Sequence, residues 1–354
     1  MAELRDILDL WQRPRAAGDE ICLATVVGIE GSAYRRPGAR MLLTASGQRA
    51  GTISGGCLEA EVAKKAWWLT AQGPSLQRYS SFFDDDGDLP YGLGCGGTVI
   101  VLLERGAAAE AALEALRCSV EERTASVIVS DTSAGATGSK ATGTVLILRE
   151  DATTAYAASE RPELLAEAQA TLAARTSRSE SGFFFEYVAP PPAVVVFGAG
   201  DDAQPLVEFT ATLGWHLTVA DGRSQLLRAE RFPQAARVIG LDAALAAIEP
   251  GDAAVLMTHS YEQDRQVLRA LLPRELKYLG VLGPRRRTER LIGEIAPELG
   301  LTLDEGFARL RAPVGLDLGG HSPAAIALSI AAELQAVFAG REARTLTAVR
   351  LIHA

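Results

Sequence analysis

Cysteine is scarce in this chain, and its few cysteines are not spaced as metal ligands. The 354 residues include Cys22, Cys57, Cys95 and Cys118, with no CxxC pair among them. Closely paired thiols are typical of zinc sites, and many cysteines in a short chain are typical of disulfide frameworks. The sequence therefore predicts neither, and a reducing cytoplasm is the expected setting.

Long apolar runs and an excess of positive charge are also lacking. Although 48% of the residues are hydrophobic, no run reaches the roughly 20 residues of a membrane-spanning helix. The first ten residues are charged and amphipathic, unlike a secretory signal peptide. The net charge of −9 disfavours nucleic acid or an anionic membrane as the main partner. We therefore expect a cytoplasmic protein with no nucleic acid and no membrane among its partners.

Three consecutive prolines, at 190–192, predict a linker between two domains, 1–189 and 193–354. Strands and helices before the prolines do not alternate regularly, which indicates an α+β domain. The strands expected there are 21–29, 125–130, 143–149, 183–188, 98–103 after the second glycine-rich segment, and a hairpin of 40–44 with 48–53. The helices expected there are 3–17, 59–72, 107–117 and 162–175.

Beyond the prolines, apolar strands alternate with helices. This alternation predicts a doubly wound parallel sheet of the Rossmann type. A final helix is expected over 323–338, with Ser322 as its N-cap and proline at its first position. The strands expected in this domain are 193–197, 216–220, 236–239, 253–257 and 278–282, with a helix over 202–213 after the first of them.

A glycine motif, Gly198-Ala-Gly200-Asp-Asp-Ala, connects the first of these strands to its helix. Glycines let the turn approach a phosphate, and the helix N-terminus favours an anion. Asp221 ends the next strand, where a ribose-binding acid is expected. The aspartates at 201 and 202 place negative charge where a pyrophosphate would lie, and Arg223 could offset it. The motif therefore predicts a Rossmann-like fold and leaves the use of NAD(P) open.

Other polar residues follow strands of the same domain. Arg285, in Gly283-Pro-Arg-Arg-Arg, suits phosphate recognition, or it belongs to a solvated helix start. His259 is a ligand contact or a structural loop residue. In the first domain, the loop over 31–41 holds Ser32 and three arginines, which suit an anion site or a surface turn. The acidic run 84–88 lacks the oxygen ligands of an EF-hand, so a solvated turn is expected.

Two glycine-rich segments each contain one thiol: Gly-Thr-Ile-Ser-Gly-Gly-Cys-Leu-Glu at 51–59 and Gly-Leu-Gly-Cys-Gly-Gly at 92–97. Glycine allows a ligand to approach the backbone closely. A buried cysteine in a tight turn is the alternative for each. Glu59 is a candidate base or simply an acid at a helix start. The candidate cofactor contacts here are Ser54, Gly55, Gly56, Cys57, Gly94, Cys95 and Gly96.

Taken together and in this order, these segments resemble the XdhC/CoxI family. Departures from the family pattern are the Asp201-Asp202 pair, Pro284 where serine is common, and Gly-Gly-His at 319–321. These departures bear on how the chain would contact a phosphate more than on its resemblance to the family. The matching stretches cover nearly the whole chain and are 31–32, 36–41, 51–59, 92–97, 196–200, 258–262 with Asp264, 278–283 with the arginines after it, and 313–319.

The resemblance implies an accessory factor for a molybdenum hydroxylase, of the xanthine dehydrogenase or CO dehydrogenase type. It would bind molybdenum cofactor, as molybdopterin or its cytosine dinucleotide form. It would keep the cofactor available to a cysteine desulfurase for sulfuration, and pass it to the apoenzyme without turnover of its own. Cys57 and Cys95 would lie near the cofactor, and the Rossmann-like half would hold its phosphate or nucleotide part. A homodimer is expected because family members often pair.

The residues allow this chemistry, since a thiolate is a soft ligand suited to molybdenum or to a sulfur relay. Cys57 or Cys95 is therefore a candidate metal or sulfur contact. An NAD(P)-dependent oxidoreductase that uses Gly198, Gly200 and Asp221 is the alternative, but no acid or base for hydride transfer is evident. A nucleotide-sensing regulator is a third hypothesis, which the glycine motif alone supports.

Overall fold

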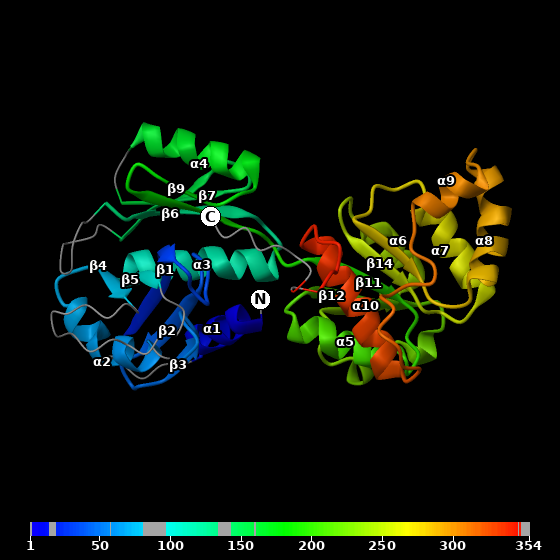
Figure 1. The fold of residues 1–354 in the computed structure, drawn as a ribbon, viewed down its shortest axis with the longest axis horizontal. Helices are drawn as coiled ribbons and strands as arrows, with labels where there is room; N and C mark the ends of the chain where they lie inside the picture. Colours follow the sequence, from blue (N-terminus) through cyan, green and yellow to red (C-terminus); the bar gives the residue numbers. More distant parts are fainter. Residues whose placement is uncertain are drawn as a thin grey trace. The chain divides into compact units, whose positions relative to one another are not determined.

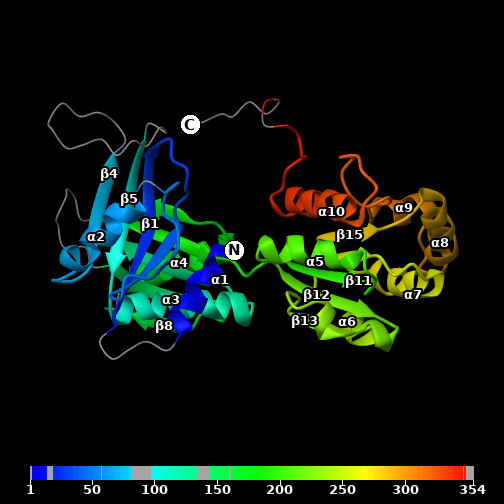
Figure 2. The same cartoon turned by 90° about the horizontal axis from the view of Figure 1, so that it is seen from below.

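The computed structural model forms two compact units, Met1–Pro191 and Pro192–Ala354. The units meet in sequence within the run of three prolines, and each has its own sheets and core (Figures 1 and 2). No helix in the described part of the chain is long and apolar enough to cross a membrane. The structure describes residues 2–13, 19–56, 58–80, 97–133, 143–158, 161–345 and 347.

Sheet A of the first unit is antiparallel, with strand order β3-β2-β1-β5-β4. Side chains alternate between the faces of a strand. On β1, Ile21 and Leu23 therefore pack with helices α1 and α3, whereas Ala24 and Val26 pack with α2. The elements are α1 (Ala2–Gln12), β1 (Ile21–Gly31), β2 (Arg40–Thr44), β3 (Arg49–Gly51), α2 (Glu59–Leu69), β4 (Ser75–Ser80), β5 (Gly97–Glu104) and α3 (Ala107–Glu121).

Sheet B of the same unit is also antiparallel, with strand order β8-β7-β6-β10-β9. Helix α4 packs Leu164 and Ala168 against one face of it. Antiparallel sheets with helices on their faces confirm the α+β prediction for this unit. The elements are β6 (Ser126–Asp131), β7 (Gly143–Arg149), β8 (Thr154–Ala157), α4 (Pro162–Ala174), β9 (Arg178–Glu180) and β10 (Phe183–Val188).

A buried ion pair connects the two sheets. Arg40 on β2 donates from Nη1 to Glu186 Oε1 on β10 at 2.8 Å, and its Nη2 contacts the other carboxylate oxygen. Nη1 also donates to the carbonyl oxygen of Gly38 at 2.8 Å. A buried charge must be paired. Arg40, one of the arginines in the predicted loop anion site, is therefore used inside the unit.

Sheet C of the second unit is parallel, with order β13-β12-β11-β14-β15. Val194 and Val196 on β11 face α5 and α10, whereas Val195 and Phe197 face α6, α7 and α8. Burial on both faces confirms the doubly wound prediction. The elements are β11 (Ala193–Phe197), α5 (Ala203–Thr212), β12 (His216–Asp221), short 3₁₀ turns η1 (Ser224–Leu226) and η2 (Ala229–Arg231), β13 (Arg237–Gly240), α6 (Leu241–Ala247), β14 (Ala253–Leu256), α7 (Tyr261–Leu271), β15 (Tyr278–Val281), α8 (Arg285–Glu298), α9 (Leu303–Ala308) and α10 (Pro323–Phe338).

The predicted elements differ from the structure mainly at edges and ends. Strands β4, β8 and β9 were not predicted, and each lies at the edge of its sheet. The first helix ends at Gln12 rather than 17. The sequence has proline at 14, and a residue before proline avoids the helical conformation. The Ser322 cap of α10 is confirmed, because its hydroxyl accepts the Ala325 amide at 3.2 Å.

Candidate functional site

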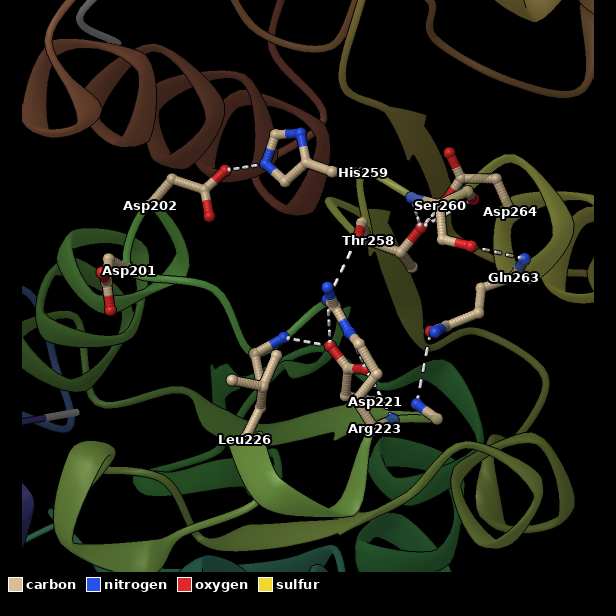
Figure 3. A network of polar contacts seen from close by, with 12 residues as sticks. Asp201, Asp202, Asp221, Arg223, Leu226, Thr258, His259, Ser260, Gln263 and Asp264 are labelled. Carbon is tan, nitrogen blue, oxygen red and sulfur yellow. Dashed lines mark hydrogen bonds and ion pairs between the residues drawn. The ribbon is translucent and has the colours of Figure 1, made fainter.

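The predicted residues of the second unit gather at the carboxyl ends of the strands of sheet C. Strands β11 and β14 are neighbours in the sheet. The strand that follows β11 in the chain, β12, lies on one side of this pair, and the strand that follows β14, β15, lies on the other. In open α/β sheets, ligands bind outside the carboxyl ends of strands at such a switch point. The glycine loop after β11 and the 257–260 loop after β14 face each other here (Figure 3).

Gly198 is required by the packing of these two loops. Its φ is +128°, and a Cβ there would lie 2.3 Å from the carbonyl oxygen of Met257. At Gly200 a Cβ would lie 2.6 Å from Asp202 Oδ1. Only glycine fits the first position without moving backbone. Gly198 is therefore explained by the close packing of the loop after β11 against the loop after β14, without any ligand.

Asp221, at the end of β12, is 1% exposed and accepts four hydrogen bonds. Its Oδ2 accepts from the Ala199 amide at 2.9 Å and Arg223 Nη2 at 2.8 Å. Its Oδ1 accepts from the Arg223 amide at 2.8 Å and Nε at 2.9 Å. Burial raises the pKa of Asp221, but these hydrogen bonds outweigh it and hold the pKa below its ordinary value. A ribose hydroxyl would have to displace one of these donors.

Arg223 is partly exposed and spans from β12 to the loop after β14. Besides its pair with Asp221, Nη2 donates to the carbonyl oxygen of Thr258 at 3.1 Å. The guanidinium therefore lies between the glycine loop and the β14 loop (Figure 3). Of the arginines predicted as phosphate contacts, Arg223 therefore lies beside the glycine loop.

Each of the two aspartates of the glycine loop contacts a basic side chain of the same unit. Asp201 Oδ1 lies 2.6 Å from Arg231 Nη2, and Asp202 Oδ2 lies 2.6 Å from His259 Nε2. His259 has a φ of +56°, uncommon for a residue with a Cβ. The Asp202–His259 pair joins the two loops across the switch point (Figure 3). Carboxylates therefore already lie where the motif would receive a phosphate.

Among the three consecutive arginines, Arg287 rather than Arg285 reaches the first turn of α7, directly after the β14 loop. Arg285 pairs with Glu289 on the exposed side of α8, with a nitrogen–oxygen distance of 3.0 Å. Arg287 Nη1 lies 2.5 Å from Asp264 Oδ2, a buried carboxylate. Asp264 Oδ1 in turn accepts from the Thr258 hydroxyl at 2.5 Å. This chain of contacts supports the His259 loop, whereas in the sequence Thr258 and Asp264 stand out only as residues that match the family.

In the first unit, Glu59 holds the loop of the first glycine–cysteine segment. Its Oε1 accepts from the amides of Ile53 at 3.1 Å and Ser54 at 2.8 Å, and its Oε2 from the Ser54 hydroxyl at 2.7 Å. Burial raises the pKa of Glu59, but these hydrogen bonds outweigh it and lower the pKa. The Ser54 Oγ also accepts from the amides of Gly56 and Leu58, each at 3.2 Å. These contacts favour the helix-start interpretation of Glu59.

The described ends of both glycine–cysteine segments lie beside one loop, 32–38. Gly97 pairs with Gly31, and a Cβ at 97 would lie 2.2 Å from the Ser32 carbonyl oxygen. A Cβ at Gly55 would lie 3.8 Å from the ring of Tyr34, which is 81% exposed. The loop therefore brings the two segments to the same end of sheet A. The predicted residues Cys57, Gly94, Cys95 and Gly96 lie outside the described residues, as does the acidic run 84–88.

The two described cysteines are poor candidates for thiolate chemistry. Burial raises the pKa of Cys22 to about 12. Burial and the Glu114 carboxylate raise the pKa of Cys118. A thiolate is the reactive and metal-binding form. Nor does the described part of the chain hold a group of three or more His, Cys, Asp or Glu side chains arranged for a metal ion.

Comparison with known proteins decides the family. A model of the XdhC Rossmann domain matches residues 194–334, and a model of the XdhC and CoxI family matches residues 15–80. A Bacillus subtilis protein named as a probable xanthine dehydrogenase subunit is 30% identical over 321 residues, which are 89% of this chain and 92% of that protein. The chain belongs to the XdhC and CoxI family.

Two further relatives match over most of their length. An Escherichia coli protein named molybdenum cofactor insertion chaperone PaoD is 27% identical over 337 residues, 94% of this chain and 88% of that protein. A crystal structure described as a xanthine dehydrogenase from Bacillus halodurans has a TM-score of 0.76 and 27% identity, covering 99% of this chain and 98% of that one. The resemblance and the fold class predicted from sequence are thereby confirmed.

Proposed function

We propose that this XdhC/CoxI-family protein is an accessory factor that carries molybdenum cofactor to a molybdenum hydroxylase, of the xanthine dehydrogenase or CO dehydrogenase type. The observation that carries the proposal is the likeness, over 94% of the chain, to a protein named as a molybdenum cofactor insertion chaperone. The protein would present the cofactor to a cysteine desulfurase for sulfuration and act as a homodimer in the cytoplasm.

The geometry of the first unit supports a role for its glycine–cysteine segments. Both segments lead to the 32–38 loop, and Glu59 and Ser54 fix the backbone around one of them. Cys22 and Cys118 are unsuited to act as thiolates. We therefore assign the contact with molybdenum or its sulfur ligand to Cys57 or Cys95. The neighbouring glycines predicted as cofactor contacts would let the cofactor approach the backbone.

The phosphate end of the cofactor, in the molybdopterin or cytosine dinucleotide form, is assigned to the switch-point edge of the second unit. Gly198 and Gly200 allow close approach there, and the Arg223 guanidinium and the His259 imidazole lie nearby. The NAD(P)-dependent alternative is disfavoured because all acceptor positions of Asp221 are used internally. Asp201 and Asp202 also oppose a pyrophosphate.

The test is the cofactor content of the full chain, purified without oxygen from a host that makes molybdenum cofactor. Molybdenum is counted by mass spectrometry and pterin by its fluorescent oxidation product. Near-stoichiometric amounts are expected in the wild type and in Cys118→Ala, and a large loss in Cys57→Ala or Cys95→Ala. Full retention in both of the latter would contradict the thiol assignment. Absence of metal and pterin, together with tight NADH binding, would refute the carrier proposal.

A further inference from the structure

A second recess of the Rossmann unit lies away from the switch point. It has a volume of about 280 Å³ and lies at the amino-terminal end of β15, where α7, α9 and α10 end. The glycine loop and the His259 loop lie at the opposite, carboxyl ends of the strands. None of the residues considered so far for the molybdenum cofactor lines this recess. A ligand bound here would therefore be a different molecule from the cofactor.

The recess concentrates positive charge in an acidic chain. Arg274, Lys277, Arg309 and Arg311 line it, and no carboxylate does. Arg311 has an acidic partner, since its Nε lies 3.9 Å from Glu333 Oε1. Arg309 lies one turn after Glu305, at the end of α9, and after the hydrogen bonds from Thr302 its charge is one of the causes that lower the pKa of that carboxyl. Among the described residues, the ion pair of Arg311 with Glu333 is the one that involves a cation of this recess. In a chain of net charge −9, these four cations are a local concentration of positive charge that favours an anion.

Two of these cations are held in place by the fold. Arg309 Nη1 donates to the Leu272 carbonyl oxygen at 3.1 Å, and Arg274 Nη1 donates to the Leu245 carbonyl oxygen at 2.7 Å. Neither bond neutralises the guanidinium. Fixed donors bind an anion at a lower entropic cost than freely moving side chains.

The wall beneath the cations is apolar. Leu271, Leu272, Leu279 and Leu310 form its floor but are buried beneath the surface. The apolar surface open to a ligand comes from Leu276 and Val337, which are half-buried, and from Ala308, which is exposed. A free inorganic anion would gain nothing from these side chains. Small-molecule sites typically combine an apolar lining with a few convergent polar groups. The recess has both.

We propose that this recess binds a small organic anion. Its carboxylate or phosphate group would be held by Lys277, Arg309 and Arg311, and its apolar body would lie on the apolar surface of Leu276, Ala308 and Val337. The volume suits a ligand with a single ring rather than a peptide or a dinucleotide. The inference goes beyond the cofactor-carrier proposal and stands independently of it.

The test is calorimetric titration of the full-length protein with phenyl phosphate, and with benzoate to identify the preferred head group. One saturable site is expected, with inorganic phosphate and phenol each binding at least about tenfold more weakly. Lys277→Gln and Arg309→Gln should each weaken binding about tenfold, the effect of one lost charge-assisted hydrogen bond. Arg237→Gln, an exposed cation on β13 of the same unit, should leave it unchanged.

Three results would overturn the proposal. The first is no saturable binding of phenyl phosphate or benzoate at millimolar concentration. The second is equal affinity in Lys277→Gln, Arg309→Gln and Arg237→Gln, since the recess would then not be the site. The third is equal binding of inorganic and phenyl phosphate, because the apolar surface of Leu276, Ala308 and Val337 would then contribute nothing. Thermal unfolding of each variant verifies that these exposed substitutions leave the unit folded.

Discussion

Replacing Glu59 with glutamine should loosen the first glycine–cysteine loop without unfolding the unit around it. The carboxylate accepts from the amides of Ile53 and Ser54 and from the Ser54 hydroxyl. Glutamine keeps one oxygen but puts an NH₂ group in place of the other. The Ser54 hydroxyl then loses its acceptor and meets a donor, so its hold on the Gly56 and Leu58 amides weakens.

The size of the effect follows from these contacts. Hydrogen bonds to a charged group contribute about 1.5–3 kcal/mol each, and glutamine retains a neutral version of some of them. We expect Glu59→Gln to lower the free energy of unfolding of the first unit by about 2 kcal/mol. For a unit of this size, each kcal/mol lowers Tm by roughly 2–4 °C, so a fall of about 4–8 °C is expected. Glu61→Gln on the same helix is the control, since its pair with Lys65 contributes only about 0.3–0.5 kcal/mol.

The effect should depend on pH. The hydrogen bonds lower the pKa of Glu59 in the folded protein relative to its unfolded value. The stabilisation is therefore complete above the unfolded pKa of about 4.3 and is lost as the pH falls through the folded pKa. Glu59→Gln should remove this dependence, so wild type and variant should converge in stability in acid.

Hydrogen–deuterium exchange measured by mass spectrometry over residues 51–59 provides the local assay. Faster exchange of this segment in Glu59→Gln, at unchanged exchange of sheet B, is the expected pattern. In the carrier proposal, the same variant should also retain less cofactor than Glu61→Gln. Identical exchange of the segment in wild type, Glu59→Gln and Glu61→Gln at neutral pH would refute the role given to Glu59.

Three other substitutions test the packing and the switch point. Arg40→Met should destabilise the first unit by about 3–5 kcal/mol, because it leaves the Glu186 carboxylate buried and unpaired; adding Glu186→Met should recover much of this in urea unfolding. Gly198→Ala should lower the stability of the second unit by about 1–3 kcal/mol in thermal unfolding, because its Cβ would meet the Met257 carbonyl oxygen. Gly240→Ala is the control and should change the stability by less than about 1 kcal/mol, since position 240 has open space and a negative φ. Asp202→Asn should change stability by less than about 1 kcal/mol yet strengthen cofactor retention, since it removes a negative charge beside the expected phosphate; weaker retention in equilibrium dialysis would show that the His259 pair is needed for binding.

The interior of the fold was predictable because its strands have a strong apolar signal. The strand over 193–197 is apolar at every position, since both of its faces are covered by helices. Edge strands have no such signal. Strand β4 exposes Arg78 and Ser80 and begins with a serine, so nothing in its composition separates it from a loop.

The candidate site was less predictable because its contacts depend on strand order and helix rotation. His259 and Asp202 are 57 residues apart and meet only because β14 lies next to β11. Which of three consecutive arginines points inward depends on the rotation of α8. Successive residues of a helix differ by about 100° in direction, and it is Arg287 that reaches Asp264. Neither fact is contained in the local sequence.

The dinucleotide motif in this chain is explained by the construction of the switch point itself. Gly198 is needed because the Met257 carbonyl lies against it, and Asp221 is needed because it receives the Ala199 amide and Arg223. Both residues would be selected in a protein that never meets a nicotinamide. The motif is therefore evidence for the fold, and the acidic Asp201-Asp202 pair is the part that bears on the ligand. A cargo with one phosphate at its end is opposed less by these charges than a dinucleotide whose pyrophosphate must lie along the whole loop.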